Sequence, residues 1–265
     1  MSKLNGILVV YSDSLSSSKR FYEEAKKQDI ILSSYISDLN RYESWDFALF
    51  RKFDQNTQHI CSRVNRQYNN FNRAHVLGSK INQDLYIDLG FPKPKTLYKR
   101  FGITYEEITD LLGSPFVAKA DVSFGGTDVM LITNPYQFYN NFERFNIYQE
   151  YIRFSSGRDI RVYVIGGEVI GSIIRVNEND FRSNMKQGGV PIQCSLSQED
   201  KDRCSKIYTK YGLDICGLDL LFNPDGGFMF CESNSSPGFD GVESEIGINI
   251  AGKIISHIKE DIRRH

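Results

Sequence analysis

The chain has 265 residues, of which 40% are hydrophobic and 25% are charged, and its formal net charge at pH 7 is −1. That length suits one large domain or two smaller ones, and the composition excludes wholesale disorder. Because 32 basic residues are balanced by 33 acidic ones, bulk electrostatics give no route to nucleic acid or to an anionic membrane. We therefore expect a globular protein with neither of these partners.

The five cysteines are odd in number and form no C-x-x-C pair. This pattern argues against a disulfide framework or a structural zinc site and is typical of a reducing compartment. The apolar run from Ile7 to Tyr11 is too short for the core of a signal peptide, and no run approaches the roughly 20 apolar residues of a membrane span. We expect a cytoplasmic protein.

The first 78 residues predict a small parallel α/β unit, because short apolar runs alternate with helical segments. Strands are expected at 6–11, 30–32 and 47–50, with a helix over 16–28. Pro92 and Pro94 then mark a connection to the rest of the chain. The fold class of this first part is therefore α/β.

The second part mixes hairpins with helices and predicts an α+β arrangement. Thr104 and Glu107 form a capping box that opens a helix ending at Gly113. Further expected elements are strands at 116–119 and 129–132, a hairpin over 161–175, a helix from Ser197 to Gly212, a hairpin over 217–232, and a last helix with Ile250, Ile254, Ile258 and Ile262 on one face.

Several kinds of active site are absent from the sequence. No two glycines stand at i and i+2, so there is no dinucleotide fingerprint, and there is no G-x-x-x-x-G-K-[ST] motif. The four histidines are scattered, and no G-x-S-x-G elbow occurs. Histidine-centred nucleophilic catalysis is therefore not favoured.

The strongest local signal is the predicted hairpin over 217–234. Strand side chains alternate between faces, so Glu232 and Asn234 share a face, and the turn places Asp219 opposite Glu232. Carboxylate and amide oxygens are ligands that Mg²⁺ prefers. The alternative is a solvated sheet face that carries two acids. The apolar residues on either side of these acids argue against it, because buried carboxylates need partners.

Two further segments carry positive charge. Lys119 ends an apolar strand, and the Gly125-Gly126 turn after it has backbone N–H groups suited to phosphate oxygens. Arg175, Arg182 and Lys186 flank a second glycine-rich segment, which suits a substrate that develops negative charge. Taken alone, the first segment is better explained as an ordinary turn with an exposed lysine, and the second as a solvated loop.

In chain order these motifs resemble the ATP-grasp ligases, and more narrowly the RimK-type α-L-glutamate ligases. The similar stretches are 149–152, 159–161, 181–184 with 188–189, 217–221, 232–238 and 247–254, in register from about residue 71 to residue 262. The resemblance implies an ATP-grasp domain over 79–265, with a lid subdomain over 96–152 and a C-terminal subdomain over 153–265. A short Rossmann-like pre-ATP-grasp domain over 1–78 would precede it. The loop at 123–127 departs from the commoner Gly-Thr-Gln-Gly form of the family.

The resemblance also implies roles for individual residues. Those that would bind ATP are Lys80, Lys119, Gly125, Gly126, Gln149, Glu150, Tyr151, Ile152, Asp159, Arg182, Ser183 and Asn184. Lys119 and Arg182 would be catalytic, offsetting the growing negative charge. Asp219, Glu232 and Asn234 would hold two Mg²⁺ ions, with Mn²⁺ as a substitute. Substrate positions would be Lys19, Arg20, Arg51, Arg161, Arg175, Ser236, Gly238 and Glu243.

The function implied by the resemblance is a ligase that joins a carboxylate to an amine through an acyl phosphate and releases ADP and phosphate. A small molecule or peptide would be the substrate, and a homo-oligomer is compatible with the family. Two alternatives stay open, namely the same chemistry on a protein C-terminal tail and a non-catalytic ATP-binding module.

Overall fold

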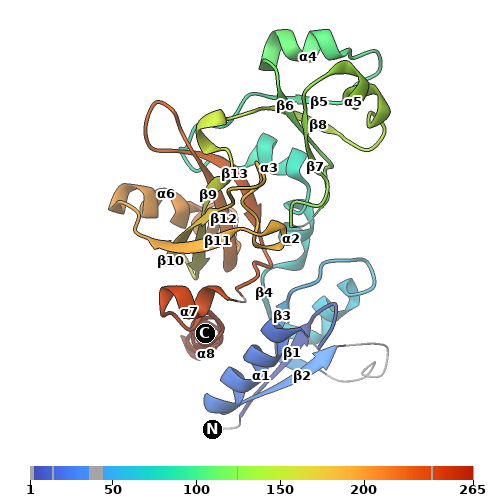
Figure 1. Cartoon of the computed structure of the whole chain (residues 1–265). Coiled ribbons are helices and arrows are strands. Elements are labelled where there is room, and N and C mark those ends of the chain that lie inside the picture. The colour runs from blue at the N-terminus through green and yellow to red at the C-terminus, as the bar shows by residue number, and fades with distance from the viewer. Residues whose placement is uncertain (1–2, 14, 36–43, 124, 240, 265) are drawn as a thin grey trace.

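The computed structural model describes residues 3–13, 15–35, 44–123, 125–239 and 241–264. The described chain contains three sheets, and Figure 1 shows them one above the other, with the N-terminal sheet at the bottom and the middle of the chain at the top. The carboxyl-terminal part lies between them.

The N-terminal sheet is parallel and has the strand order β2-β1-β3-β4. Its strands are β1 (Leu4–Val9), β2 (Ile30–Tyr35), β3 (Trp45–Phe50) and β4 (Val64–Tyr68), with helix α1 (Ser16–Lys27) after β1 and the 3₁₀ helix η2 (Gln58–Arg63) before β4. The predicted parallel α/β unit is confirmed. Strand β1 starts and ends two residues earlier than predicted, because Tyr11 is 66% exposed and already belongs to the loop.

Two short helices, α2 (Phe71–Val76) and α3 (Lys80–Tyr86), lead to the second sheet. Both begin with a side-chain cap, from Asn70 and Ser79 respectively. These caps fix where each helix starts, at the junction between the N-terminal sheet and the rest of the chain.

The second sheet is antiparallel, with the order β5-β8-β6-β7. It contains β5 (Thr96–Tyr98), β6 (Phe116–Lys119), β7 (Val129–Ile132) and β8 (Ile147–Glu150), together with helices α4 (Tyr105–Leu112) and α5 (Pro135–Asn140). The ranges predicted for β6 and β7 are confirmed. Thr104 Oγ1 accepts the Glu107 N–H at 3.1 Å, as the capping box requires, while the Glu107 carboxylate pairs with Arg100.

The third sheet has the order β11-β10-β9-β12-β13 and is antiparallel throughout. Its strands are β9 (Arg158–Ile165), β10 (Glu168–Val176), β11 (Val190–Cys194), β12 (Ile215–Phe222) and β13 (Phe228–Asn234). The remaining elements are η3 (Arg153–Ser155), η4 (Met185–Gln187), α6 (Gln198–Thr209), α7 (Val242–Ile246) and α8 (Ile250–Arg264). The predicted hairpins and helices are confirmed.

Strand alternation divides this third sheet between two cores. Val162 and Leu218 pack with Ile207 of α6 on one face, whereas Tyr163 packs with Ile254 of α8 on the other. The core under α8 also contains N-terminal residues, among them Leu8, Phe21, Phe47 and Tyr68. Helix α8 therefore lies between the N-terminal sheet and the third sheet, beside α1 (Figure 1).

The predicted isoleucine face of the last helix is confirmed. Ile250, Ile254 and Ile258 are at most 1% exposed, and Ile262 is partly buried against the same core. Among the residues that the structure describes, none of the helices is long and apolar enough to cross a membrane.

Candidate active site

The hairpin formed by β12 and β13 places the predicted metal ligands side by side. Asp219 is the register partner of Glu232, and Gly217 is the partner of Asn234. Leu218 and Leu220 alternate with Asp219 and are fully buried in the core beneath α6. That burial forces Asp219 to the opposite face of the sheet, where Glu232 and Asn234 are half-buried.

Asp219 is held by two arginines. Arg161 donates from both Nε and Nη2 to its carboxylate, with 2.8 Å between Nη2 and Oδ2, and Arg175 Nη2 lies 3.0 Å from Oδ2. Arg175 also donates to Asp159, from Nε at 2.8 Å and from Nη2. The four side chains thus form a network of alternating charge, in the order Asp159, Arg175, Asp219 and Arg161. Each of them is at most 8% exposed.

This buried network shifts the pKa values of Asp159 and Asp219 in opposite directions. Burial raises the pKa of Asp159 against the opposing charge of Arg175. For Asp219 burial also acts to raise the pKa, but the charges of Arg161 and Arg175 outweigh it and the pKa is lowered. Asp219 is therefore a stable anion next to Glu232.

The oxygen atoms of Asp219, Glu232 and Asn234 are of the kinds that Mg²⁺ prefers as ligands. Asp219 Oδ2 accepts from both arginines and Oδ1 accepts from Arg161 Nε, which leaves one lone pair on Oδ1 for a cation. Asn234 Oδ1 accepts the Ser236 N–H at 2.8 Å, and an amide oxygen has a second lone pair that can bind a cation. Within the described ranges, no group of three His, Cys, Asp or Glu side chains could hold a metal ion. A site here therefore depends on the Asn234 amide as well as on the two carboxylates.

Lys119, at the end of β6, reaches from the second sheet to this hairpin. Its Nζ donates to Gln149 Oε1 at 2.6 Å and lies 3.8 Å from Cys231 Sγ, next to Glu232 in the chain. Gln149 is buried and donates in turn to Thr96 Oγ1 at 3.0 Å. The side chain of Gln149, itself a predicted ATP-binding residue, therefore orients Lys119.

The rest of the predicted 149–152 stretch connects the second sheet to the third. Glu150 pairs with Lys95, donating its backbone N–H to the Lys95 carbonyl at 2.9 Å and accepting the Lys95 N–H at 3.2 Å. Tyr151 donates to Ser156 Oγ at 2.6 Å, and Ile152 is 9% exposed. These contacts hold residues 149–152 in place at the junction of the two sheets, where β8 ends.

The glycine turn between β6 and β7 contacts the predicted cationic segment, with residue 124 outside the described residues. Arg182 Nη1 donates to the Gly126 carbonyl at 2.8 Å. A Cβ added at Gly126 would lie 2.6 Å from Asn184 Oδ1, and one at Gly125 would lie 2.8 Å from Lys186 Cδ. Both glycines also have a positive φ, of 67° and 74°, so a side chain at either position would be strained and would displace its neighbour.

Arg182 and Lys80 both form hydrogen bonds with residues near the glycine turn or the cationic segment. Arg182 donates from Nε and Nη2 to Asp180, whose pKa is lowered by that hydrogen bond. Lys80 Nζ donates to the carbonyl of Ser123 at 3.0 Å and to its hydroxyl at 3.2 Å. Ser183 is 6% exposed and hydrogen-bonds to Asp159. The predicted ATP-binding residues therefore border one region between the second and third sheets.

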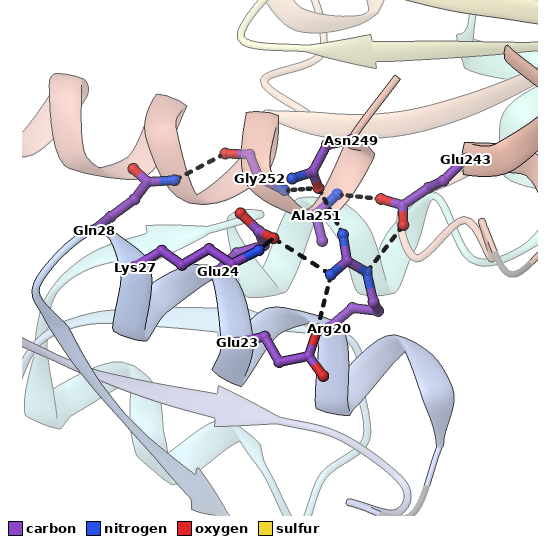
Figure 2. A network of polar contacts seen from close by, with 9 residues as sticks. All are labelled: Arg20, Glu23, Glu24, Lys27, Gln28, Glu243, Asn249, Ala251 and Gly252. Atoms are coloured by element: carbon purple, nitrogen blue, oxygen red, sulfur yellow. Dashed lines mark hydrogen bonds and ion pairs between the residues drawn. The ribbon is translucent and has the colours of Figure 1, made fainter. Parts of the chain in front are cut away.

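Two of the predicted substrate residues are partners of each other. Figure 2 shows Arg20 of α1 donating from Nε to Glu243 Oε2, at 3.1 Å. Arg51 donates to the Pro237 carbonyl at 2.9 Å, Ser236 Oγ to the Arg51 carbonyl at 3.2 Å, and Tyr163 to the Gly238 carbonyl at 2.9 Å. Lys19 is exposed. Apart from Lys19, these side chains and carbonyls bind protein groups.

Three residues that matter to the site were not predicted. Asn69 joins Ile215 and Ser235, donating to their carbonyls at 2.7 and 2.9 Å. Gln83 donates to the Ser233 carbonyl at 2.9 Å and accepts its N–H at 2.7 Å. No sequence pattern reveals these long-range contacts, whereas Asp180 could have been found from its position two residues before Arg182.

Comparison with known proteins agrees with this geometry. A family model described as the RimK-like ATP-grasp domain matches residues 91–258. Human beta-citrylglutamate synthase B is 32% identical over 178 residues, which are 63% of this chain and 46% of that protein. A probable alpha-L-glutamate ligase of Thioalkalivibrio sulfidiphilus is 31% identical over 176 residues, 62% of this chain and 58% of that protein. The chain thus spans about half the length of these curated relatives.

Solved structures show the same fold at low sequence identity. The macrocyclase MdnC of Microcystis aeruginosa MRC, bound to the precursor peptide MdnA, has a TM-score of 0.77 at 13% identity over 97% of this chain and 100% of that chain. The ATP-grasp ligase PsnB, complexed with minimal precursor, Mg and ADP, has a TM-score of 0.74 at 18% identity, covering 99% of each chain. The predicted ATP-grasp fold is confirmed.

Proposed function

Because the chain belongs to the RimK-like ATP-grasp family, we propose that it is an ATP- and Mg²⁺-dependent ligase. It would join a carboxylate of an amino acid or peptide to an amine through an acyl phosphate, releasing ADP and phosphate. The observation that carries the proposal is the meeting of two sheets at one point. Lys119 reaches the β12–β13 hairpin beside Cys231, where Asp219 and Glu232 are register partners.

Each charged group has a task in this reaction. Asp219, Glu232 and Asn234 would hold Mg²⁺, as two ions that Mn²⁺ can replace, and the metal supplies charge neutralisation for the phosphate oxygens. Lys119 and Arg182 offset the negative charge that grows as a substrate carboxylate attacks the γ-phosphorus. The amine then displaces phosphate from the acyl phosphate, so that an amide forms.

The glycine turn serves the same reaction by covering the triphosphate. Gly125 and Gly126 lie against the 182–187 segment, so the turn and this segment together would cover a nucleotide bound beside Lys119 and shield it from solvent. Shielding matters because water would hydrolyse the acyl phosphate before the amine attacks it. The solved structures that bind precursor peptides support a peptide as one substrate, beside a free amino acid.

A phosphate-release screen tests the proposal. The protein is incubated with ATP, Mg²⁺ and pairs of amino acids or short peptides, and the products are weighed by mass spectrometry. We expect phosphate release that depends on both substrates and a product lighter by one water than their sum. Steady ATP hydrolysis that no carboxylate and amine stimulate would favour a non-catalytic nucleotide-binding module instead.

A charge-removing variant tests the metal assignment. Glu232→Gln keeps the shape of the side chain but removes one of the two site carboxylates, so we expect Mg²⁺-dependent turnover to fall by at least about 100-fold. Asp225→Asn is the matched control, because this exposed acid lies in the turn of the same hairpin. Turnover of Glu232→Gln equal to that of Asp225→Asn would refute the assignment.

A further inference from the structure

The segment that follows the metal hairpin is held by the N-terminal part of the chain. We call residues 235–239 and 241–243, which lead from Asn234 into the first turn of α7, the connecting segment. Asn69 donates to the Ser235 carbonyl at 2.9 Å and Arg51 to the Pro237 carbonyl at 2.9 Å. Asn69 is fully buried and Arg51 is 8% exposed. These bonds are therefore shielded from competing water.

Arg51 also packs the segment through its guanidinium group. The group lies 5.4 Å from the ring centre of Phe21 on α1 and 5.7 Å from that of Phe239 in the connecting segment. The two rings meet edge to face at 5.5 Å. A buried cation within about 6 Å of two aromatic rings is a favourable arrangement. Arg51 thus fixes the middle of the connecting segment against α1.

Arg20 fixes its far end, as Figure 2 shows. The guanidinium donates to Glu243 Oε2 at 3.1 Å, in the first turn of α7, and to Asn249 Oδ1 at 3.0 Å, in the loop between α7 and α8. Glu243 Oε1 then accepts the Ala251 N–H at 2.9 Å, and Asn249 Oδ1 accepts the Gly252 N–H at 2.8 Å, both in the first turn of α8. One side chain of α1 therefore links α7 to the start of α8.

We propose that Arg20 and Arg51 are positioning residues that hold the connecting segment and, through it, Asn234 at the metal hairpin. The link to Asn234 is direct, because its Oδ1 accepts the N–H of Ser236 inside the segment. Both arginines act from the N-terminal part on a site formed by the other two sheets. The metal assignment of Asn234 rests on the proposed function, whereas the hold on the segment does not.

The substitution Arg20→Met tests this inference, with Arg66→Met as a matched control. Arg66 also joins the N-terminal sheet to α8 through a carboxylate, donating from Nε to Asp261 Oδ2 at 3.0 Å, but it does not contact the connecting segment in any described interaction. We expect the fold to tolerate the loss of Arg20, because Glu24 keeps Lys27 at 2.7 Å and Glu243 keeps the Ala251 N–H.

Two readouts are measured on the full chain. Hydrogen–deuterium exchange follows peptides covering 234–247, and Mn²⁺ binding in the presence of ADP follows the metal site by electron paramagnetic resonance. We expect Arg20→Met to speed exchange in these peptides about tenfold and to weaken Mn²⁺ binding several-fold, with exchange elsewhere in the third sheet unchanged. Arg51→Lys, which keeps the charge but loses the planar fork, should do the same. Arg66→Met should do neither.

Three results would overturn the inference. Exchange that stays at the wild-type rate shows that the arginines do not hold the segment, and equal acceleration in Arg66→Met shows a general loosening. Faster exchange with unchanged Mn²⁺ affinity shows that the segment does not position Asn234. If wild-type protein binds neither ADP nor Mn²⁺, the proposed function fails, and the exchange rates alone then show whether the arginines hold the segment.

Discussion

Replacing Arg175 by methionine should expose how the buried charges at the site depend on one another. Arg175 is 4% exposed and donates to two acids, Asp159 and Asp219. After its loss Asp219 keeps the two bonds from Arg161, but Asp159 keeps only Ser183. One buried carboxylate is then left without a countercharge. Removing one partner of such a pair costs about 3–5 kcal/mol, so we expect the free energy of unfolding to fall by that amount.

Urea unfolding at pH 8 and pH 5 measures this loss. Burial already raises the pKa of Asp159 against the charge of Arg175, and removal of that charge raises it further. The folded variant then favours the protonated acid, so its stability decreases as the pH rises and the loss is larger at pH 8. Arg175→Met combined with Asp159→Asn should regain most of the stability. A loss below about 1 kcal/mol, or no recovery in the double variant, would refute this reasoning.

Other features of the structure support two further predictions. Burial raises the pKa of Asp214 to about 6 from 3.8, so the folded chain holds a proton that the unfolded chain releases between these values. Asp214→Asn should therefore add up to about 3 kcal/mol of stability at pH 7.5, with a smaller gain near pH 4; an equal gain at both pH values in urea unfolding would contradict this. Gly126→Ala should weaken ADP binding about tenfold by calorimetry, because its Cβ would meet Asn184. Gly102→Ala is the control, because Gly102 has a similar positive φ but no atom within 4 Å of an added Cβ. An equal loss of ADP affinity in Gly102→Ala would argue against the contact with Asn184 as the cause.

Local sequence signals predicted those parts of the fold that local chemistry determines. The capping side chains of Thr104 and Ser197 mark where α4 and α6 begin. Alternation along the 217–234 hairpin gave Asp219 opposite Glu232, which the register confirms. Strand β4 was missed, because its central residues, Asn65, Arg66 and Gln67, are polar and lie at the sheet edge.

The pairing of the charged residues at the site could not be predicted in this way. Arg161 and Asp219 are 58 residues apart and meet only because β9 pairs with β12. Arg175 reaches the same acid because β10 pairs with β9 on the other side. The resemblance to a family assigned Arg20 and Glu243 to substrate, and the structure brings them together with each other. Strand order in a sheet, and not spacing in the chain, decides which charges meet.

The shared core under α8 has a consequence for how the protein is made. Phe21 and Leu8 belong to the beginning of the chain, and the isoleucines that cover them belong to its last helix. During synthesis helix α1 can cover part of this face of the first sheet, but the part that packs against α8 stays uncovered until residues 250–258 emerge. At ordinary elongation rates of about 5–20 residues per second, this interval is on the order of ten seconds or more. Over that time the nascent N-terminal sheet is a natural client for chaperones that bind apolar surface.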